Sequence, residues 1–129
     1  MYETTFRKDG DLLRVRITGE RTREAVASVS KEIMETCLRK GTRKLLIDVR
    51  KFVGRLTLAD DYQLPAKEFR TLPPHGGLLQ AAAVLDLPEN DARFALFEDA
   101  ARSQGYNFRV FSEAERALKW LDEQDLKRV

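Results

Sequence analysis

Apolar and polar residues alternate near the start of the chain. Leu13, Val15 and Ile17 are separated by polar or charged residues, which predicts a strand with one buried face. An Asp-Gly pair at positions 9–10 precedes this strand and supplies residue types that tolerate a positive φ. We therefore expect a β-hairpin over residues 2–19 with its turn at that pair.

The next segment has the spacing of an amphipathic helix. Thr22 is a suitable N-cap, and Gly41 is a suitable residue to end the helix. Between them, apolar residues recur at three- and four-residue steps, which predicts one buried stripe. The stripe comprises Val26, Val29, Ile33 and Cys37, widened by Met34 and Leu38. Because Cys37 lies on this stripe, we expect a buried and unreactive thiol.

Further along, short apolar runs alternate with helical patterns. Runs without alternation are typical of strands that are covered on both faces, as in a parallel sheet between helices. The expected strands are 44–49, 80–86 and 107–111, and the expected helices are 57–70, 89–105 and 112–123. The element order is β-β-α-β-α-β-α-β-α. It predicts an α/β fold with a mixed sheet in which the hairpin supplies one antiparallel pairing.

Length and composition fit a single globular domain over residues 1–129. Hydrophobic residues make up 43% of the chain and charged residues 34%, and the net charge is only +2. A near balance of charge argues against a nucleic-acid-binding protein. The N-terminal residues lack an apolar signal region, and no apolar run is long enough to span a bilayer. We therefore expect a cytoplasmic protein that is not an integral membrane protein.

Candidate binding residues gather where two of the apolar runs end. Asp48 and Asp86 are expected to end their strands, and Arg50, Gly54 and Arg55 follow the first of them. In open α/β sheets, ligands bind at the carboxyl ends of parallel strands. A structural alternative is that both carboxylates accept amide hydrogen bonds and only turn the chain. We favour this structural alternative.

The residues needed for catalysis or metal binding are sparse. His75 is the single histidine and Cys37 the single cysteine, so the chain cannot form a zinc site of familiar composition or a disulfide. Acidic residues at the expected helix starts complement the helix dipole and disfavour phosphate. We therefore expect no cofactor, no metal and no enzymatic activity.

Three stretches carry a family resemblance: "KLLIDVRKFVGRLTLADDYQL", "AAAVLD" and "FRVFSEAERALKWL". Together they resemble a SpoIIAA-like protein of the STAS superfamily, the sulfate transporter and anti-sigma factor antagonist domains. The resemblance implies a STAS-like fold and a non-enzymatic regulatory module that acts through a protein partner. Anti-sigma factor antagonists carry a phosphorylatable serine in an Asp-Ser-Ser-Gly setting, which this chain lacks. Thr57 is the one hydroxyl in the matching window, beside Asp60 and Asp61, and we expect it to be a helix cap rather than a phosphorylation site.

Two alternatives remain open for what the module binds. SpoIIAA-like sequences also resemble the lipid-binding CRAL-TRIO fold, which suggests a carrier of a small apolar ligand. Leu58 and Tyr62 would then belong to a movable apolar flap, although both also fit an ordinary helix core. Association into a homodimer is left open as well. The candidate residues for binding a ligand or partner are Asp48, Arg50, Gly54, Arg55, Leu58, Tyr62 and Asp86.

Overall fold

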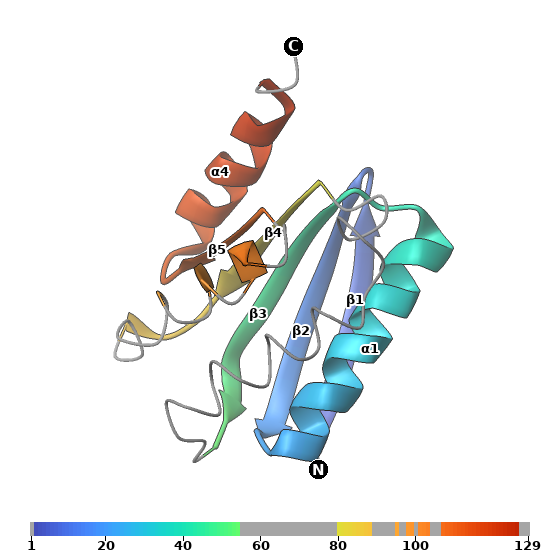
Figure 1. Ribbon diagram of the computed structural model, residues 1–129, viewed down its shortest axis with the longest axis vertical. Coiled ribbons are helices and arrows are strands. Elements are labelled where there is room, and N and C mark those ends of the chain that lie inside the picture. Colours follow the sequence, from blue (N-terminus) through green and yellow to red (C-terminus); the bar gives the residue numbers. More distant parts are fainter. Residues whose placement is uncertain are drawn as a thin grey trace.

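A computed structural model describes residues 2–54, 80–88 and 107–126, together with residues 95, 98–99 and 101–103 (Figure 1). The elements in this part of the chain are β1 Tyr2–Asp9, β2 Leu12–Glu20, α1 Arg23–Lys40, β3 Lys44–Val53, β4 Ala81–Leu85, β5 Phe108–Phe111 and α4 Ala114–Leu126.

The strands form one five-stranded sheet in the order β1-β2-β3-β4-β5. β1 and β2 pair antiparallel, and every later pairing is parallel. This confirms the expected mixed sheet with an N-terminal hairpin. Residues 95, 98–99 and 101–102 are helical, and they fall within the helix predicted over 89–105, between β4 and β5 in the sequence. The helix predicted over 57–70 falls outside the described residues.

The hairpin turn lies one residue later than predicted. Asp9 still pairs with Leu12, so Gly10 and Asp11 form the turn, and Gly10 has a φ of 58°. The carboxylate of Asp9 explains why this residue belongs to the strand. Arg7 and Arg14 are register partners, and Asp9 lies 3.5 Å from the Nε of Arg7 and 3.0 Å from the Nε of Arg14. The acid thereby offsets the repulsion between two like charges on facing strands.

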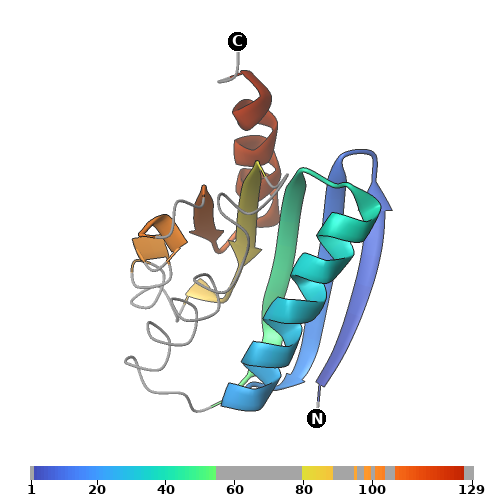
Figure 2. The same cartoon turned by 45° about the vertical axis from the view of Figure 1, so that its right-hand side comes forward.

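Two helices cover opposite faces of the sheet (Figure 2). α1 packs on a core that includes Val15 and Leu45, whereas α4 packs on a second core that includes Leu46. Adjacent residues of one strand point to opposite faces, so Leu45 and Leu46 contribute to different cores. All of β4 is buried, which confirms that this apolar run is covered on both sides.

α1 follows the predicted caps but not the whole predicted stripe. The hydroxyl of Thr22 accepts a hydrogen bond from the Ala25 amide at 3.1 Å, and Gly41 has a φ of 65° as the C-terminal cap. Cys37 is buried, and this burial raises the pKa of its thiol, an effect that nearby Thr42 partly offsets. Leu38 was assigned to the stripe, but its side chain is 48% exposed. Within the described part of the chain, no helix has the length and apolar character needed to cross a membrane.

Gly54 lies where two backbone segments approach each other closely. The amide of Arg21 donates a hydrogen bond of 2.8 Å to the carbonyl of Val53, which draws the start of α1 against the end of β3. A Cβ atom on Gly54 would overlap the carbonyl oxygen of Arg21. The binding role expected for Gly54 stays a prediction, whereas its close approach to a second backbone segment requires a residue without a side chain.

We predict that Gly54→Ala lowers the free energy of unfolding by about 1–3 kcal/mol, because two backbone segments must separate to admit the methyl group. Val53→Ala is the matched control. Val53 is the neighbouring residue and is 57% exposed, so its truncation should change stability by less than about 0.5 kcal/mol. Urea unfolding of both variants measures the difference. Equal stability of the two variants would contradict the close approach at Gly54.

Candidate functional site

Asp48 does not end its strand, which corrects the prediction from sequence. β3 continues to Val53, although its pairing with β4 stops at Asp48, which faces Leu85. Beyond this point, within the described residues, β3 pairs with β2 alone. Asp48 therefore lies where β4 ends, at the edge that the sequence identified, but in the middle of a longer strand.

The pairing of β2 with β3 shifts register immediately after Asp48. Arg16 faces Asp48, but the next recorded pair joins Thr18 to Lys51, so β3 carries one extra residue there. Such a β-bulge interrupts the alternation of side chains. As a result Arg50 and Lys51 both follow Asp48 on the face of the sheet that carries α4. Phe52 returns to the opposite core, where its ring lies 6.4 Å from that of Tyr2.

The carboxylate of Asp48 spans this bulge and accepts three hydrogen bonds from Arg50. Oδ1 accepts hydrogen bonds from the backbone amide of Arg50 at 3.1 Å and from its Nε at 2.9 Å. Oδ2 accepts a third from Nη2 at 2.7 Å, and the Nε of Arg16 lies 3.8 Å from the same oxygen. A bidentate arginine–carboxylate pair fixes the plane of the guanidinium as well as its position.

The Asp48 carboxylate is held in its ionised form. Burial alone would raise its pKa, but the hydrogen bonds from the side chain and backbone of Arg50, with the charges of Arg50 and Arg16, outweigh that effect. The pKa of Asp48 is therefore lowered from 3.8. The same pairing raises the pKa of Arg50. Both groups are charged under ordinary conditions, and together they form a rigid ion pair.

Several cations lie near this pair, on the part of the same sheet face that α4 does not cover. We call Arg14, Arg16, Arg50 and Lys51 the basic strip. The side chains of Arg16 and Arg50 are 67% and 40% exposed, whereas that of Asp48 is only 15% exposed. The carboxylate of Asp48 thus lies beneath the arginines, closer to the sheet, and the arginine side chains face solvent. Such an arrangement suits the binding of carboxylates or other anions.

Asp86 directly follows β4, as predicted, but it does not join Asp48. Leu85 is the register partner of Asp48 and shares its face, so alternation directs Asp86 to the opposite face. Its Oδ1 accepts a hydrogen bond from the Leu87 amide at 2.7 Å, and its own amide donates to the Phe111 carbonyl at 2.9 Å. The bond from the Leu87 amide is of the kind that the structural alternative expected of Asp86, whereas Asp48 lies within a strand and does not turn the chain. Among the described residues, no three acid, histidine or cysteine side chains gather in a way that could hold a metal ion.

The remaining candidates of the sequence prediction, Arg55, Leu58 and Tyr62, lie in the range 55–79, outside the described residues. Thr57 and His75 lie in the same range. The apolar-ligand alternative and the capping role of Thr57 therefore stay predictions.

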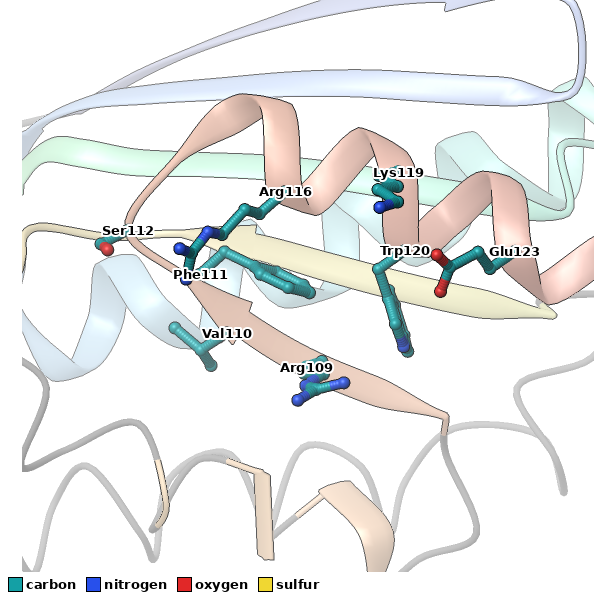
Figure 3. Close-up of a pocket in the computed structure, with 8 residues that line it drawn as sticks. All are labelled: Arg109, Val110, Phe111, Ser112, Arg116, Lys119, Trp120 and Glu123. Atoms are coloured by element: carbon teal, nitrogen blue, oxygen red, sulfur yellow. The ribbon is translucent and has the colours of Figure 1, made fainter.

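The sequence prediction missed a hollow of about 410 Å³ between β5 and α4 (Figure 3). From the sequence, Phe111 is predicted to lie in a strand and Trp120 in a helix, with no binding role for either residue. Their rings lie 5.7 Å apart, and the guanidinium of Arg109 lies 5.6 Å from the centre of the Phe111 ring. The interleaving of basic and aromatic residues in "FRVF" and "ERALKW" was the available signal.

The fold agrees with those of the proteins that the chain resembles. The model of the SpoIIAA-like family matches residues 12–122, and the chain belongs to that family. No curated protein matches the sequence. An anti-sigma factor antagonist from Mycobacterium paratuberculosis has a similar crystal structure, with a TM-score of 0.62 at 12% identity over 95% of each chain. An uncharacterized protein with a SpoIIAA-like fold from Shewanella loihica gives a TM-score of 0.55 at 22% identity over 93% of each chain. The STAS-type family and fold predicted from three motifs are thereby confirmed.

We predict that Asp48→Asn lowers the free energy of unfolding at neutral pH by about 1–3 kcal/mol, because the charge-assisted bonds to Arg50 are lost. The pKa of Asp48 is lower in the folded state than in the unfolded state. Ionised Asp48 therefore stabilises the fold fully at pH values above its unfolded-state pKa. This stabilisation is lost as the pH falls through its folded-state pKa. The stability gap between the wild type and Asp48→Asn should therefore shrink below about pH 4.

Urea unfolding of both proteins across a series of pH values measures this gap. Asp122→Asn is the control, because Asp122 is exposed on α4 and should show little difference at any pH. A stability difference of constant size from neutral to acidic pH would contradict an ionised Asp48 paired with Arg50.

Proposed function

We propose that this chain is a non-enzymatic regulatory module that binds a protein partner, and that the basic strip contacts an acidic surface of that partner. The observation that carries the proposal is the bidentate Asp48–Arg50 clamp at the bulge of β3, beside the exposed Arg16. Membership of the SpoIIAA-like family and the fold shared with an anti-sigma factor antagonist support a regulatory role.

The clamp orients Arg50 without using all of its donors. Asp48 engages Nε and Nη2, while a guanidinium has five N–H donors in all. The remaining donors, with those of Arg16, can bind carboxylates of a partner. Because the guanidinium is already fixed, binding costs less side-chain entropy than it would for a free arginine.

Placement on strands adds to this preorganisation. Arg14 and Arg16 alternate along β2, and Arg50 and Lys51 follow at the bulge of β3, so the backbone sets the spacing of all four cations. Two acids beside them, Asp9 and Asp48, are already paired with arginines. Partner binding through such a strip should weaken as salt rises, since screening acts on exposed charges.

We predict that Arg16→Glu lowers capture of the partner by at least about tenfold, because like charges then face each other across the interface. The measurement is affinity capture from extracts of the native host with quantitative mass spectrometry. Lys8→Glu is the matched control, because Lys8 is an exposed strand cation whose register partner, Leu13, belongs to the core on the α1 side.

Lys8→Glu should keep the melting temperature of the wild type within a few degrees, about the effect of a surface change, whereas Arg16→Glu should lower it further because it places a second carboxylate near Asp48. A partner that binds wild type, Arg16→Glu and Lys8→Glu equally would remove the basic strip from the proposal. Failure to recover any reproducible partner would overturn the proposal as a whole.

A further inference from the structure

The hollow between β5 and α4 is separate from the basic strip and carries a different chemistry. β5 is the edge strand of the sheet, and α4 follows it after a two-residue connection, Ser112 and Glu113. Figure 3 shows Trp120 extending from α4 toward β5, with Arg109 and Phe111 on the strand. The volume of about 410 Å³ falls in the range of roughly 300–1,000 Å³ typical of small-molecule sites.

The charges around this hollow are unbalanced. Among the described residues that line it, three are cations, Arg109, Arg116 and Lys119, and one is an acid, Glu123. Arg116 has an acid partner, Glu113, at 2.8 Å. Within the part of the chain that the structure describes, no acid lies within ion-pair distance of Arg109 or Lys119. An anion entering the hollow would therefore meet two cations whose charge is not already neutralised.

The apolar wall of the hollow is aromatic. Phe111 and Trp120 meet at an interplanar angle of 49°, and Arg109 lies over the Phe111 ring. This contact orients the guanidinium by a cation–π interaction and leaves its edge available to an acidic group. The tilted rings and the guanidinium plane form a wall beside which another planar ring can pack, with Trp120 contributing the small part of its ring that is exposed.

Addition of a peptide strand at β5 is a poorer fit to this edge. The carboxylate of Glu98 accepts the backbone amide of Val110 at 2.9 Å, and Arg102 lies 3.6 Å from that carboxylate. A strand that pairs with β5 would have to displace Glu98 to reach this amide. Side chains rather than backbone groups are thus the recognition elements at this edge.

The geometry points to a binding site for a small aromatic ligand that carries a carboxylate. The ring of the ligand packs beside Trp120 and the Arg109–Phe111 pair, and its carboxylate binds Arg109 and Lys119. This site does not depend on the basic strip or on the protein partner proposed above.

Binding can be followed directly, because Trp120 is the single tryptophan of the chain and lines the hollow. The probe is cinnamate, a planar aromatic carboxylate. Two comparison compounds each remove one feature: cinnamamide lacks the charge, and cyclohexanepropionate lacks the aromatic ring. Isothermal titration calorimetry gives Kd, while tryptophan emission reports contact at the hollow.

Cinnamate should bind at least about tenfold more tightly than cinnamamide, the effect of one charge-assisted hydrogen bond. Cyclohexanepropionate should bind several-fold more weakly than cinnamate, because stacking is lost. Arg109→Gln and Lys119→Gln should each weaken cinnamate binding by about tenfold. Arg39→Gln, a change to an exposed arginine on α1, should leave it unchanged.

Each measurement has an outcome that overturns the proposal. Equal affinities for cinnamate and cinnamamide would remove the role of the cations, and equal affinities for cinnamate and cyclohexanepropionate would remove the aromatic requirement. Wild-type affinity in both Arg109→Gln and Lys119→Gln would place the ligand elsewhere. So would binding heat without a change in Trp120 emission. Absence of any signal at millimolar cinnamate would rule out the site.

Discussion

The ion pair between Asp48 and Arg50 stabilises β3 at the point where its surroundings in the sheet change. This strand lies between β2 and β4 as far as Asp48, and beyond that residue β2 is its one neighbour among the strands that the structure describes. A strand buried on both sides must then continue as an exposed one. The bulge makes this change, and Asp48 stabilises it by accepting both the backbone amide and the guanidinium of Arg50. The same bulge turns Phe52 into the core and leaves two cations outside.

The division of the sheet between α1 and α4 determines where surface remains for binding. α4 packs on the sheet through Ala117, Trp120 and Leu121, and on the same face Arg14 and Arg16 of β2 are exposed. This part of the face carries the basic strip. At the other side of α4, the edge strand β5 leaves the hollow lined by Arg109 and Trp120. One helix thus separates two cationic surfaces, of which only the second has aromatic walls.

Sequence patterns located the elements well because burial dictates them, but they placed the site less well. The run of alanines and Val84 in β4 is buried throughout, and Thr22 and Gly41 cap α1 as their chemistry requires. The predicted end of β3 was wrong, because the charged residues after Asp48 resemble a loop in sequence. Only the register with β2 shows that they continue the strand. The pairing of Phe111 with Trp120 also depends on the packing of α4 on β5, which no periodicity encodes.

The two surfaces should differ in what they select, although both attract anions. On the basic strip, Arg16 and Arg50 are well exposed and lie on a broad sheet face, so screening by salt acts strongly and contact with a wide acidic surface is needed for affinity. In the hollow, Trp120 is 8% exposed and Arg109 lies over an aromatic ring. Part of the binding energy there comes from packing, which salt does not screen. A ligand of the hollow should therefore keep its affinity at ionic strengths that release a partner from the strip.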